Sequence, residues 1–372
     1  MRRRPAIMWS LLALLFLGYV AAVIINIKDN QTKVEKTTYQ QWRSTYVKES
    51  DEGNYVETSL KGKESISLSE GHGYGMLITM QAAKRGWASE NEFYDFYRYY
   101  KNFRLSKDKP LMSWRQKFDE DTEVKKETTN ATDGDLDIAY ALIEASKQWP
   151  DSHTDYKGAA KKLLSAIKTR NYNSDTKLLT VGDWAKKDSD FYALVRPSDI
   201  IPSYFDTFAA FTGDSFWKTL KTNSMKVLES LSSQHKTGLI PDFAWVKDGT
   251  VTPAKKDQVA GVNDGNYGAN ACRLPWRLAS SNDKAANQVL SKMMNFFLEE
   301  STITEGYTLA GKPLSSNKSE NFSAPILYAA KKKEAYGNLV DSQSWVIQNG
   351  LSEDDYYGDT LTTLVTLQMN QK

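Results

Sequence analysis

Aspartates crowd a short stretch in the first half of the chain, where residues 131–142 read ATDGDLDIAYAL. Asp133, Asp135 and Asp137 are followed by apolar side chains that recur every three or four positions from Ile138 to Trp149. This spacing predicts a helix with one buried face and with the carboxylates at its N-terminal end. Carboxylates there cap free N–H groups and are favoured by the helix dipole. Carboxylates also serve as general acids and bases, so the stretch is either a capped helix start or part of a catalytic site.

A second acidic position, Glu70, precedes a run of alternating glycines, since residues 71–75 read GHGYG. A helical apolar pattern begins directly after them at Met76. The glycines do not predict a nucleotide site, because their spacing is not Gly-x-Gly-x-x-Gly, no strand precedes them and no P-loop lysine follows. Glycines leave the backbone bare, so we expect open space for a bulky ligand beside Glu70. The alternative is that Glu70 is an ordinary loop acid and Ser69 a helix cap.

The elements that must position these residues are mainly helices. Helical periodicity is present at residues 93–103, 136–149, 159–170, 204–211, 216–231, 285–298, 324–335 and 360–369. Strand-like alternation is short, as at residues 178–181, and no composition break divides the chain after its N-terminal segment. Helices at this density fit an α-solenoid or a closed α/α barrel. The absence of a repeat of about 34 or 40 residues disfavours the solenoid.

Composition excludes several classes of protein. The 372 residues hold 48 Lys and Arg against 46 Asp and Glu, without a long basic block, which disfavours nucleic-acid binding. The 3 His lack metal-ligand spacing and indicate neither a metal site nor a Ser-His-Asp triad, and the lone Cys272 cannot form an intramolecular disulfide. The 10 Trp and 20 Tyr exceed what a core of this size usually needs. Flat aromatic faces are typical of carbohydrate-binding clefts.

The N-terminal segment differs from the rest of the chain. Arginines at positions 2–4 precede an uncharged run from Ala6 to Ile27, which matches the roughly 20 residues that cross a bilayer. We therefore expect residues 1–27 to be a transmembrane signal-anchor, with the arginines cytoplasmic and the remainder outside the cell. The alternative is a signal peptide that is cleaved near Ala21 and Ala22, which would release a secreted protein. Residues 28–38 are polar and predict a stem, which leaves residues 39–372 as one folded domain.

Together the two acidic stretches resemble glycoside hydrolase family 8. Residues 69–76 (SEGHGYGM) look like the acid-bearing motif of the family, and residues 131–149 match its signature at each constrained position. Shorter similarities follow at residues 111–114, 182–184, 196–199, 241–243 and 272–277. The resemblance extends over residues 39–369 in the right order, and it is specific because several motifs agree.

This resemblance implies an all-α fold, an (α/α)6 barrel with a long cleft at one end, and an inverting endo-hydrolase of β-1,4-linked polysaccharide. It makes Glu70 the general acid that protonates the departing glycosidic oxygen. It makes Asp133 the residue that holds the distorted sugar, with Asp135 as a less favoured substitute. An acid that works at neutral pH needs a raised pKa, which a shielded site supplies. No cofactor or metal is expected, because inverting glycosidases need none.

The general base departs from the pattern of the family. In its main branch an aspartate stands just before a motif like residues 271–273, and this chain has Asn270 there. In the chitosanase and lichenase branch a glutamate in the preceding loop is the base, but residues 258–261 hold no acid. Asp264 is the nearest carboxylate and is either the base or a turn residue of Asn-Asp-Gly. The base stays open, with two fallback candidates, Asp199 and Asp242.

Substrate contacts are expected from aromatic and charged residues outside the helical patterns. Trp114 and Trp184 lie in loop-like contexts where they can stack on sugar faces, and so can Tyr267. Arg273 either orients a catalytic carboxylate or forms a structural pair. Asp199 is a further candidate for sugar binding.

The expected protein is therefore a membrane-anchored glycosidase that faces the outside of the cell and trims an exopolysaccharide beside the machinery that makes it. The anchor carries this expectation, because a tethered enzyme cannot follow its substrate far. The candidate substrates are cellulose, mixed-linkage β-glucan, chitosan and another amino-sugar polymer. One alternative is a polysaccharide-binding or assembly protein that keeps the cleft and has lost the base. Another is an α-solenoid scaffold that binds no sugar.

Overall fold

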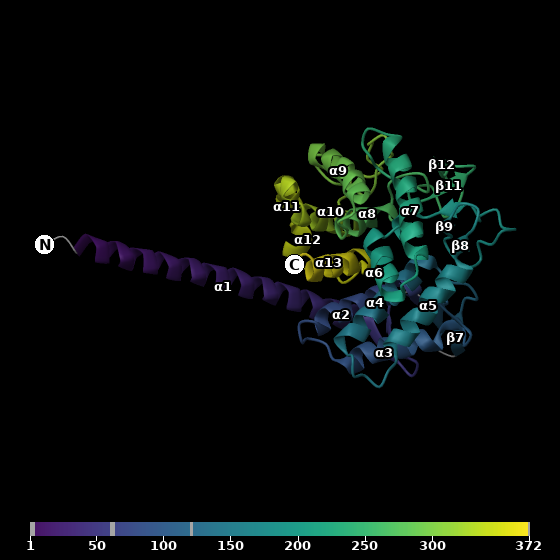
Figure 1. Cartoon of the computed structure of the whole chain (residues 1–372), viewed down its shortest axis with the longest axis horizontal. Coiled ribbons are helices and arrows are strands. Elements are labelled where there is room, and N and C mark those ends of the chain that lie inside the picture. The colour runs from purple at the N-terminus through teal and green to yellow at the C-terminus, as the bar shows by residue number, and fades with distance from the viewer. Residues whose placement is uncertain (1–3, 60–63, 120–121, 371–372) are drawn as a thin grey trace.

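The computed structural model describes residues 4–59, 64–119 and 122–370, and it is mostly helical (Figure 1). The longer helices are α1 (Arg4–Tyr46), α2 (Ser69–Ala83), α3 (Glu90–Asn102), α4 (Thr132–Gln148), α5 (Tyr156–Arg170), α6 (Pro202–Thr212), α7 (Phe216–Ser233), α9 (Lys284–Glu299), α10 (Glu320–Lys332) and α13 (Tyr356–Gln368). The shorter ones are α8 (Leu274–Ala279), α11 (Gly337–Gln343), α12 (Trp345–Gln348) and the 3-10 helices η1 (Pro197–Asp199), η2 (Ala271–Arg273) and η3 (Glu334–Tyr336). Each helical segment that periodicity indicated overlaps one of these helices.

The helices close into a barrel. An inner ring forms because α2, α4, α6, α8, α10 and α13 each pack against the next, and α13 returns to α2. An outer helix packs on each inner one: α3 on α2, α5 on α4, α7 on α6, α9 on α8, α11 on α10 and α1 on α13. Apolar side chains from both rings form one continuous core. This alternation of inner and outer helices confirms the predicted (α/α)6 barrel.

The last part of α1 belongs to the barrel wall. Trp42 Nε1 donates to Thr360 Oγ1 at 2.9 Å, and Tyr46 Oη donates to Asp359 Oδ2 at 2.6 Å. Both partners lie in α13. Contact with the barrel already begins at Glu35, which pairs with Arg85 at 2.8 Å. The predicted stem, residues 28–38, is therefore helical and partly packed on the barrel.

The first part of α1 projects away from the barrel (Figure 1). It carries exposed large apolar side chains between Trp9 and Ile27. Within the described parts of the chain, no helix has both the length and the apolarity that crossing a bilayer requires. The prediction of a signal-anchor at residues 1–27 is thus not confirmed. Residues 1–3, which include Arg2 and Arg3 of the predicted orientation signal, lie outside the described residues.

Short antiparallel strands fill many of the connections. They are β1 (Val47–Ser50), β2 (Gly53–Val56), β3 (Ser65–Leu68), β4 (Arg104–Ser106), β5 (Lys109–Met112), β6 (Arg115–Asp119), β7 (Thr122–Lys126), β8 (Tyr172–Asn173), β9 (Leu178–Leu179), β10 (Leu194–Val195), β11 (Ala244–Lys247) and β12 (Thr250–Pro253). They form sheets in the orders β1-β2, β3-β6-β7, β4-β5, β8-β9 and β10-β11-β12. The sequence indicated only β9, because strands of 2 to 5 residues are too short for alternation to stand out.

The glycines of α2 allow close packing. A Cβ on Gly71 would lie 2.5 Å from Tyr356 Oη of α13, and a Cβ on Gly73 would lie 2.8 Å from Asp137 Cβ of α4. Real Cβ atoms do not approach other atoms so closely, so only glycine fits at these positions. The prediction that these glycines leave open space for a ligand is wrong. They draw α2 against its neighbours and so fix the position of Glu70.

Candidate active site

The N-terminal ends of α2 and α4 meet at one end of the barrel. Glu70 lies in the first turn of α2, and Asp133 lies in the first turn of α4. The two helix starts are so close that a Cβ on Gly134 would lie 2.6 Å from the carbonyl carbon of Ser69. The glycine of the acidic stretch therefore allows the two carboxylates, far apart in the sequence, to share one site.

The N-cap residues of these two helices are apolar. The N-cap of α4 is Ala131, and the N-cap of α2 is Leu68, and neither forms a side-chain cap hydrogen bond. Asp133 lies inside the first turn of α4, where its Oδ1 accepts from the backbone N–H of Gly134 at 3.0 Å and its Oδ2 forms ion pairs with Arg196 and with Arg273. Asp133 therefore satisfies a free N–H of the α4 start and also belongs to the charged cluster, so the two interpretations of the acidic stretch are compatible, whereas Ser69 Oγ has no hydrogen-bond partner among the described residues.

Arg273, at the end of η2, is the centre of the site. Its side chain is 1% exposed, and Nη1 donates to Glu70 Oε2 at 2.8 Å and to Asp133 Oδ2 at 3.1 Å. Nη2 donates to Ser198 Oγ at 2.8 Å and to Asn270 Oδ1 at 3.2 Å. Of the two roles that the sequence left open for Arg273, these contacts favour the orientation of carboxylates.

The two carboxylates have opposite pKa shifts. Burial raises the pKa of Glu70 to about 7, which the Asp133 charge reinforces and Arg273 opposes. Burial also acts to raise the pKa of Asp133, but Arg196 and Arg273 outweigh it and lower that pKa to about 2. At neutral pH Glu70 can therefore hold a proton while Asp133 stays charged. Two neighbouring carboxylates with pKa values pushed apart are typical of an acid beside a permanently charged partner.

Asp242 lies against the backbone at the position where a base was expected. Its Oδ1 accepts from the backbone N–H groups of Gly268 at 3.1 Å, Asn270 at 3.0 Å and Ala271 at 2.7 Å. Burial raises the pKa of Asp242 to about 6, although these hydrogen bonds act against the rise. Among the described residues, no donor occupies its Oδ2. Asp242 thus keeps one carboxylate oxygen for another partner.

Asp264 uses its carboxylate within its own loop. Oδ2 accepts from the backbone N–H of Val259 at 2.6 Å, and Oδ1 accepts from those of Ala260 at 3.0 Å and Gly261 at 2.9 Å. The residue is 3% exposed. These contacts favour the turn-residue interpretation of Asp264 over that of a base.

Asp199 ends η1 beside the charged cluster. Its Oδ1 lies 3.8 Å from Arg196 Nε and has no hydrogen-bond partner in the described part of the chain. Burial raises its pKa to about 7, against the opposing charge of Arg196. The structure therefore brings Asp199 next to the arginine that also pairs with Asp133.

Two of the predicted stacking residues keep accessible surface. Trp184 is 38% exposed and its ring meets Phe191 edge-on, with the centroids 5.3 Å apart. Trp114 is half-buried, and the Arg115 guanidinium lies over its ring at 4.4 Å. The Trp114 carbonyl accepts the N–H of Ser69 at 3.0 Å, which places this residue beside the start of α2.

Two other predicted substrate-binding residues are enclosed by protein. Asp135 is fully buried, and its oxygens accept from the N–H of Met112 at 2.9 Å and from Asn130 Nδ2 at 2.7 Å. Burial raises the pKa of Asp135 to about 8. Tyr267 is also fully buried, and its ring packs against Phe297. Both predictions are wrong, because neither side chain offers a surface to a sugar.

Two site residues were missed by sequence reasoning. Tyr74 Oη accepts from Arg273 Nη1 at 3.1 Å, and Arg196 pairs with Asp133. Tyr74 lies four positions after Glu70 and so shares its helix face, which is a signal in the sequence. Arg196 opens the short motif at residues 196–199, where only the aspartate drew attention.

The arrangement can carry out acid catalysis without a metal-ligand set. Among the described residues, no group of His, Cys, Asp and Glu side chains is placed to hold a metal ion. The side chain of Glu70 is 20% exposed, so its proton can reach a ligand at the barrel end. A protonated carboxyl near pH 7 and a fixed carboxylate beside it are suited to the cleavage of an acetal bond.

Comparison with known proteins agrees with this chemistry. A family model described as glycosyl hydrolases family 8 matches residues 7–371. The chain is 33% identical over 347 residues to a protein named beta-glucanase from Niallia circulans. The alignment covers 90% of this chain and 83% of that protein. The chain is also 24% identical over 362 residues to a protein named endoglucanase from Escherichia coli (strain K12). That alignment covers 93% of this chain and 90% of that protein.

Solved structures show the same fold. The apo structure of a beta-1,3-1,4-glucanase from Paenibacillus sp. X4 superposes with a TM-score of 0.82 at 32% identity and covers 92% of each chain. A cold-adapted family 8 xylanase superposes with a TM-score of 0.72 at 19% identity, covering 89% of this chain and 90% of that one. At that identity the xylanase supports the fold alone.

Proposed function

The chain belongs to glycoside hydrolase family 8, and from this premise we propose that it is an inverting endo-hydrolase of β-glucan with Glu70 as its general acid. The observation that carries this proposal is the contrast between Glu70, whose pKa is raised to about 7, and Asp133, whose pKa is lowered to about 2. Glu70 gives its proton to the departing glycosidic oxygen.

Asp133 supplies a fixed negative charge beside the bond that breaks. The transition state of glycoside hydrolysis resembles an oxocarbenium ion, so positive charge develops on the sugar. Arg273 and Arg196 keep Asp133 ionised and hold its carboxylate in place. Asp133 thereby favours the distorted sugar, as the sequence predicted for it.

Inversion also requires a base that activates water on the far face of the sugar, with the two carboxyl groups about 6.5–9.5 Å apart. Asn270 cannot serve, because an amide does not accept a proton near neutral pH. Asp242 fits best of the candidates, because it lies against the Asn270 backbone, keeps Oδ2 available and is mostly ionised at pH 7 with a pKa of about 6. Asp264 would first have to leave its turn, and Asp199 is the remaining alternative.

Mixed-linkage β-glucan is the substrate that the relatives support first. Over the aligned residues, the beta-glucanase and the beta-1,3-1,4-glucanase are 33% and 32% identical to this chain. We propose that Trp114 and Trp184 stack on sugar rings, because neither side chain is fully buried. Cellulose and chitosan are the comparison substrates.

The test is to incubate the full-length protein with mixed-linkage β-glucan, cellulose and chitosan and to measure the reducing ends that are released. Proton NMR then shows which anomer of the new reducing end forms first. We expect mixed-linkage β-glucan to release the most reducing ends. We also expect the new reducing end to form first as the α-anomer, because inversion at a β-linkage gives the α-configuration. The β-anomer as first product would overturn the inverting mechanism. Complete inactivity on all substrates would favour the alternative function, a polysaccharide-binding protein without a base, which Asn270 supports.

A position at the cell surface is also part of the proposal. The projecting part of α1 exposes large apolar side chains such as Trp9 (67%), Phe16 (66%) and Tyr19 (69%), and exposed apolar surface of this kind is typical of contact with a membrane or a partner. There the enzyme would trim an exopolysaccharide beside its synthesis machinery. Cell fractionation tests this: the full chain should sediment with membranes, and a variant without residues 1–27 should not. Recovery of the protein in the medium with its N-terminus cut near Ala22 would contradict the anchor.

A further inference from the structure

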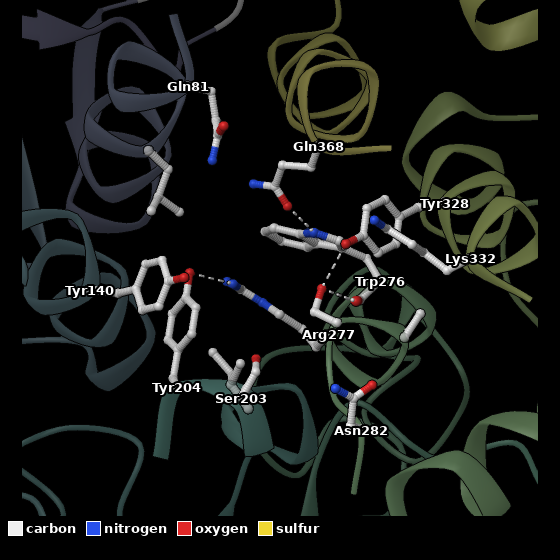
Figure 2. Close-up of a pocket in the computed structure, with 14 residues that line it drawn as sticks. Gln81, Tyr140, Ser203, Tyr204, Trp276, Arg277, Asn282, Tyr328, Lys332 and Gln368 are labelled. Carbon is white, nitrogen blue, oxygen red and sulfur yellow. Dashed lines mark hydrogen bonds between the residues drawn. The ribbon is translucent and has the colours of Figure 1, made fainter. Parts of the chain in front are cut away.

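A second pocket lies at the other end of the barrel from Glu70. Its walls include the last turns of α2, α10 and α13, together with α8, Tyr140 of α4 and the first turn of α6, whereas Glu70 lies in the first turn of α2 (Figure 2). Its volume is about 400 Å³, and sites for small molecules commonly measure about 300–1,000 Å³. Neither Glu70 nor Asp133 is among the described residues that line it. The pocket is therefore separate from the candidate active site.

Aromatic rings and hydrogen-bonding groups share the walls of this pocket. The rings of Tyr140 and Tyr204 stack with their centroids 4.1 Å apart, and Trp276 and Tyr328 lie across from them (Figure 2). Amide and hydroxyl side chains stand between the rings: Gln81, Ser203, Asn282 and Gln368. A sugar has both apolar C–H faces and hydroxyl edges, so it matches such a mixed lining.

Arg277 supplies a donor inside the pocket. Figure 2 shows its side chain crossing the middle of the pocket between Tyr204 and Trp276. The residue is 2% exposed, and its buried Nε has no hydrogen-bond partner among the described residues. A buried donor without a partner costs about 1–3 kcal/mol. A ligand oxygen at Nε would remove this cost once the side chain turns slightly, because Nε itself has almost no accessible surface.

The charge of Arg277 is already balanced. Its Nη1 lies 2.9 Å from Asp137 Oδ1, and its Nη2 lies 2.6 Å from Asp137 Oδ2. The guanidinium also lies over the Trp276 ring at 3.9 Å. An anion at Nε would face the Asp137 carboxylate across one guanidinium. Lys332 also lines the pocket, on its far wall, with Nζ over the Tyr328 ring at 5.6 Å. At Nε itself, the acceptor that fits is therefore a neutral hydroxyl oxygen.

We propose that this pocket is a second, non-catalytic binding site for a neutral sugar of one or two residues. Arg277 Nε would donate to a hydroxyl, and Tyr140 would cover the ring face. The identity of the sugar as a product of β-glucan cleavage rests on the proposed function. The existence of the site does not, because it stands on the pocket and on Arg277.

The test is calorimetric titration of the full-length Glu70→Gln protein, which removes turnover, with glucose and with cellobiose. In this background Ser203→Phe fills the pocket, and Ser203→Ala is the matched control that leaves it open. Ser203 lines the pocket and is half-buried at its rim. We expect Ser203→Phe to remove one binding site or weaken it by about tenfold or more, and Ser203→Ala to change its affinity by about twofold or less.

A second variant, Tyr140→Ala, removes the ring face and should weaken sugar binding in the same pocket. It keeps the proposal testable if Ser203→Phe does not fold. Equal binding in all these variants would overturn the proposal. Glucuronate or inorganic phosphate that binds more tightly than the neutral sugars would overturn it too. Sugar binding that depends on Ser203, together with a wild-type protein that is inactive on every β-glucan, would refute the proposed substrate and leave the pocket site standing.

Discussion

Arg273 Nη1 lies 2.8 Å from Glu70 Oε2, yet burial still raises the pKa of Glu70 to about 7. The guanidinium favours the ionised carboxylate, so the rise would be larger without it. An acid catalyst works best when its pKa lies near the working pH. Arg273 therefore limits the shift and leaves Glu70 able both to hold and to release its proton near neutral pH.

Replacing Glu70 with glutamine should abolish most of the activity. The glutamine side chain has the same shape and cannot donate the proton, so kcat/KM on β-glucan should fall about 10²- to 10⁴-fold. Aryl glycosides with good leaving groups need less protonation and should lose less. Glu64→Gln is the matched control, because Glu64 forms an exposed pair with Lys117 and should keep full activity. Equal rates for Glu70→Gln and the wild type on β-glucan would remove Glu70 from the acid role.

The dependence of kcat/KM on pH should be a narrow bell. Glu70 must be protonated, so activity should fall as the pH rises through about 7. Asp242 must be ionised if it is the base, so activity should fall as the pH drops through about 6. The pH profile of kcat/KM is measured from initial rates at constant ionic strength. The alkaline limb should vanish in Glu70→Gln and the acid limb in Asp242→Asn, whereas Asp264→Asn should keep both limbs. An acid limb that is lost in Asp264→Asn and kept in Asp242→Asn would return the base to Asp264.

Removing the charge of Arg273 should move the alkaline limb. Arg273 lowers the pKa of Glu70, so Arg273→Gln should raise it and shift the limb to higher pH. Arg273→Lys keeps the charge and should leave the limb close to that of the wild type. It should lower kcat, since a single ammonium cannot keep the contacts to Glu70, Ser198 and Asn270 together. The same limb in all three proteins would mean that Arg273 does not tune Glu70.

The resemblance in the sequence predicted the barrel and ranked Asp133 above Asp135 as a site residue, but the local spacing alone left Asp135 as a substitute. Two residues on a helix that are two positions apart point about 200° away from each other. Asp133 therefore faces Arg273, whereas Asp135 faces the backbone of Met112. Which of these directions leads to the active site depends on the packing of α4 in the barrel, and both aspartates satisfy the same local pattern.

Long-range pairing explains the error at Tyr267. The residue lies between turn-forming residues, which favours an exposed loop. In the structure its backbone N–H donates to the Tyr307 carbonyl at 2.9 Å, and the Tyr307 N–H donates back at 3.0 Å. This pairing draws the ring of Tyr267 into the core. Local spacing holds no information on a partner so far along the chain.

The close contact between α2 and α4 should make Gly73 intolerant of even a methyl group. A Cβ there would lie 2.8 Å from Asp137 Cβ and 3.1 Å from the Gly134 carbonyl oxygen, and neither can move without shifting α4. Overpacking of this kind costs about 1–3 kcal/mol, so Gly73→Ala should lower the free energy of unfolding in urea by that amount. Gly337→Ala is the matched control, because Gly337 is also in a helix, α11, and no atom lies within 4 Å of its Cβ position. It should be neutral or slightly stabilising, since alanine is the better helix former.

Because α4 carries Asp133, Gly73→Ala should also lower kcat. Unchanged stability and an unchanged rate would show that α2 and α4 can separate without moving the site.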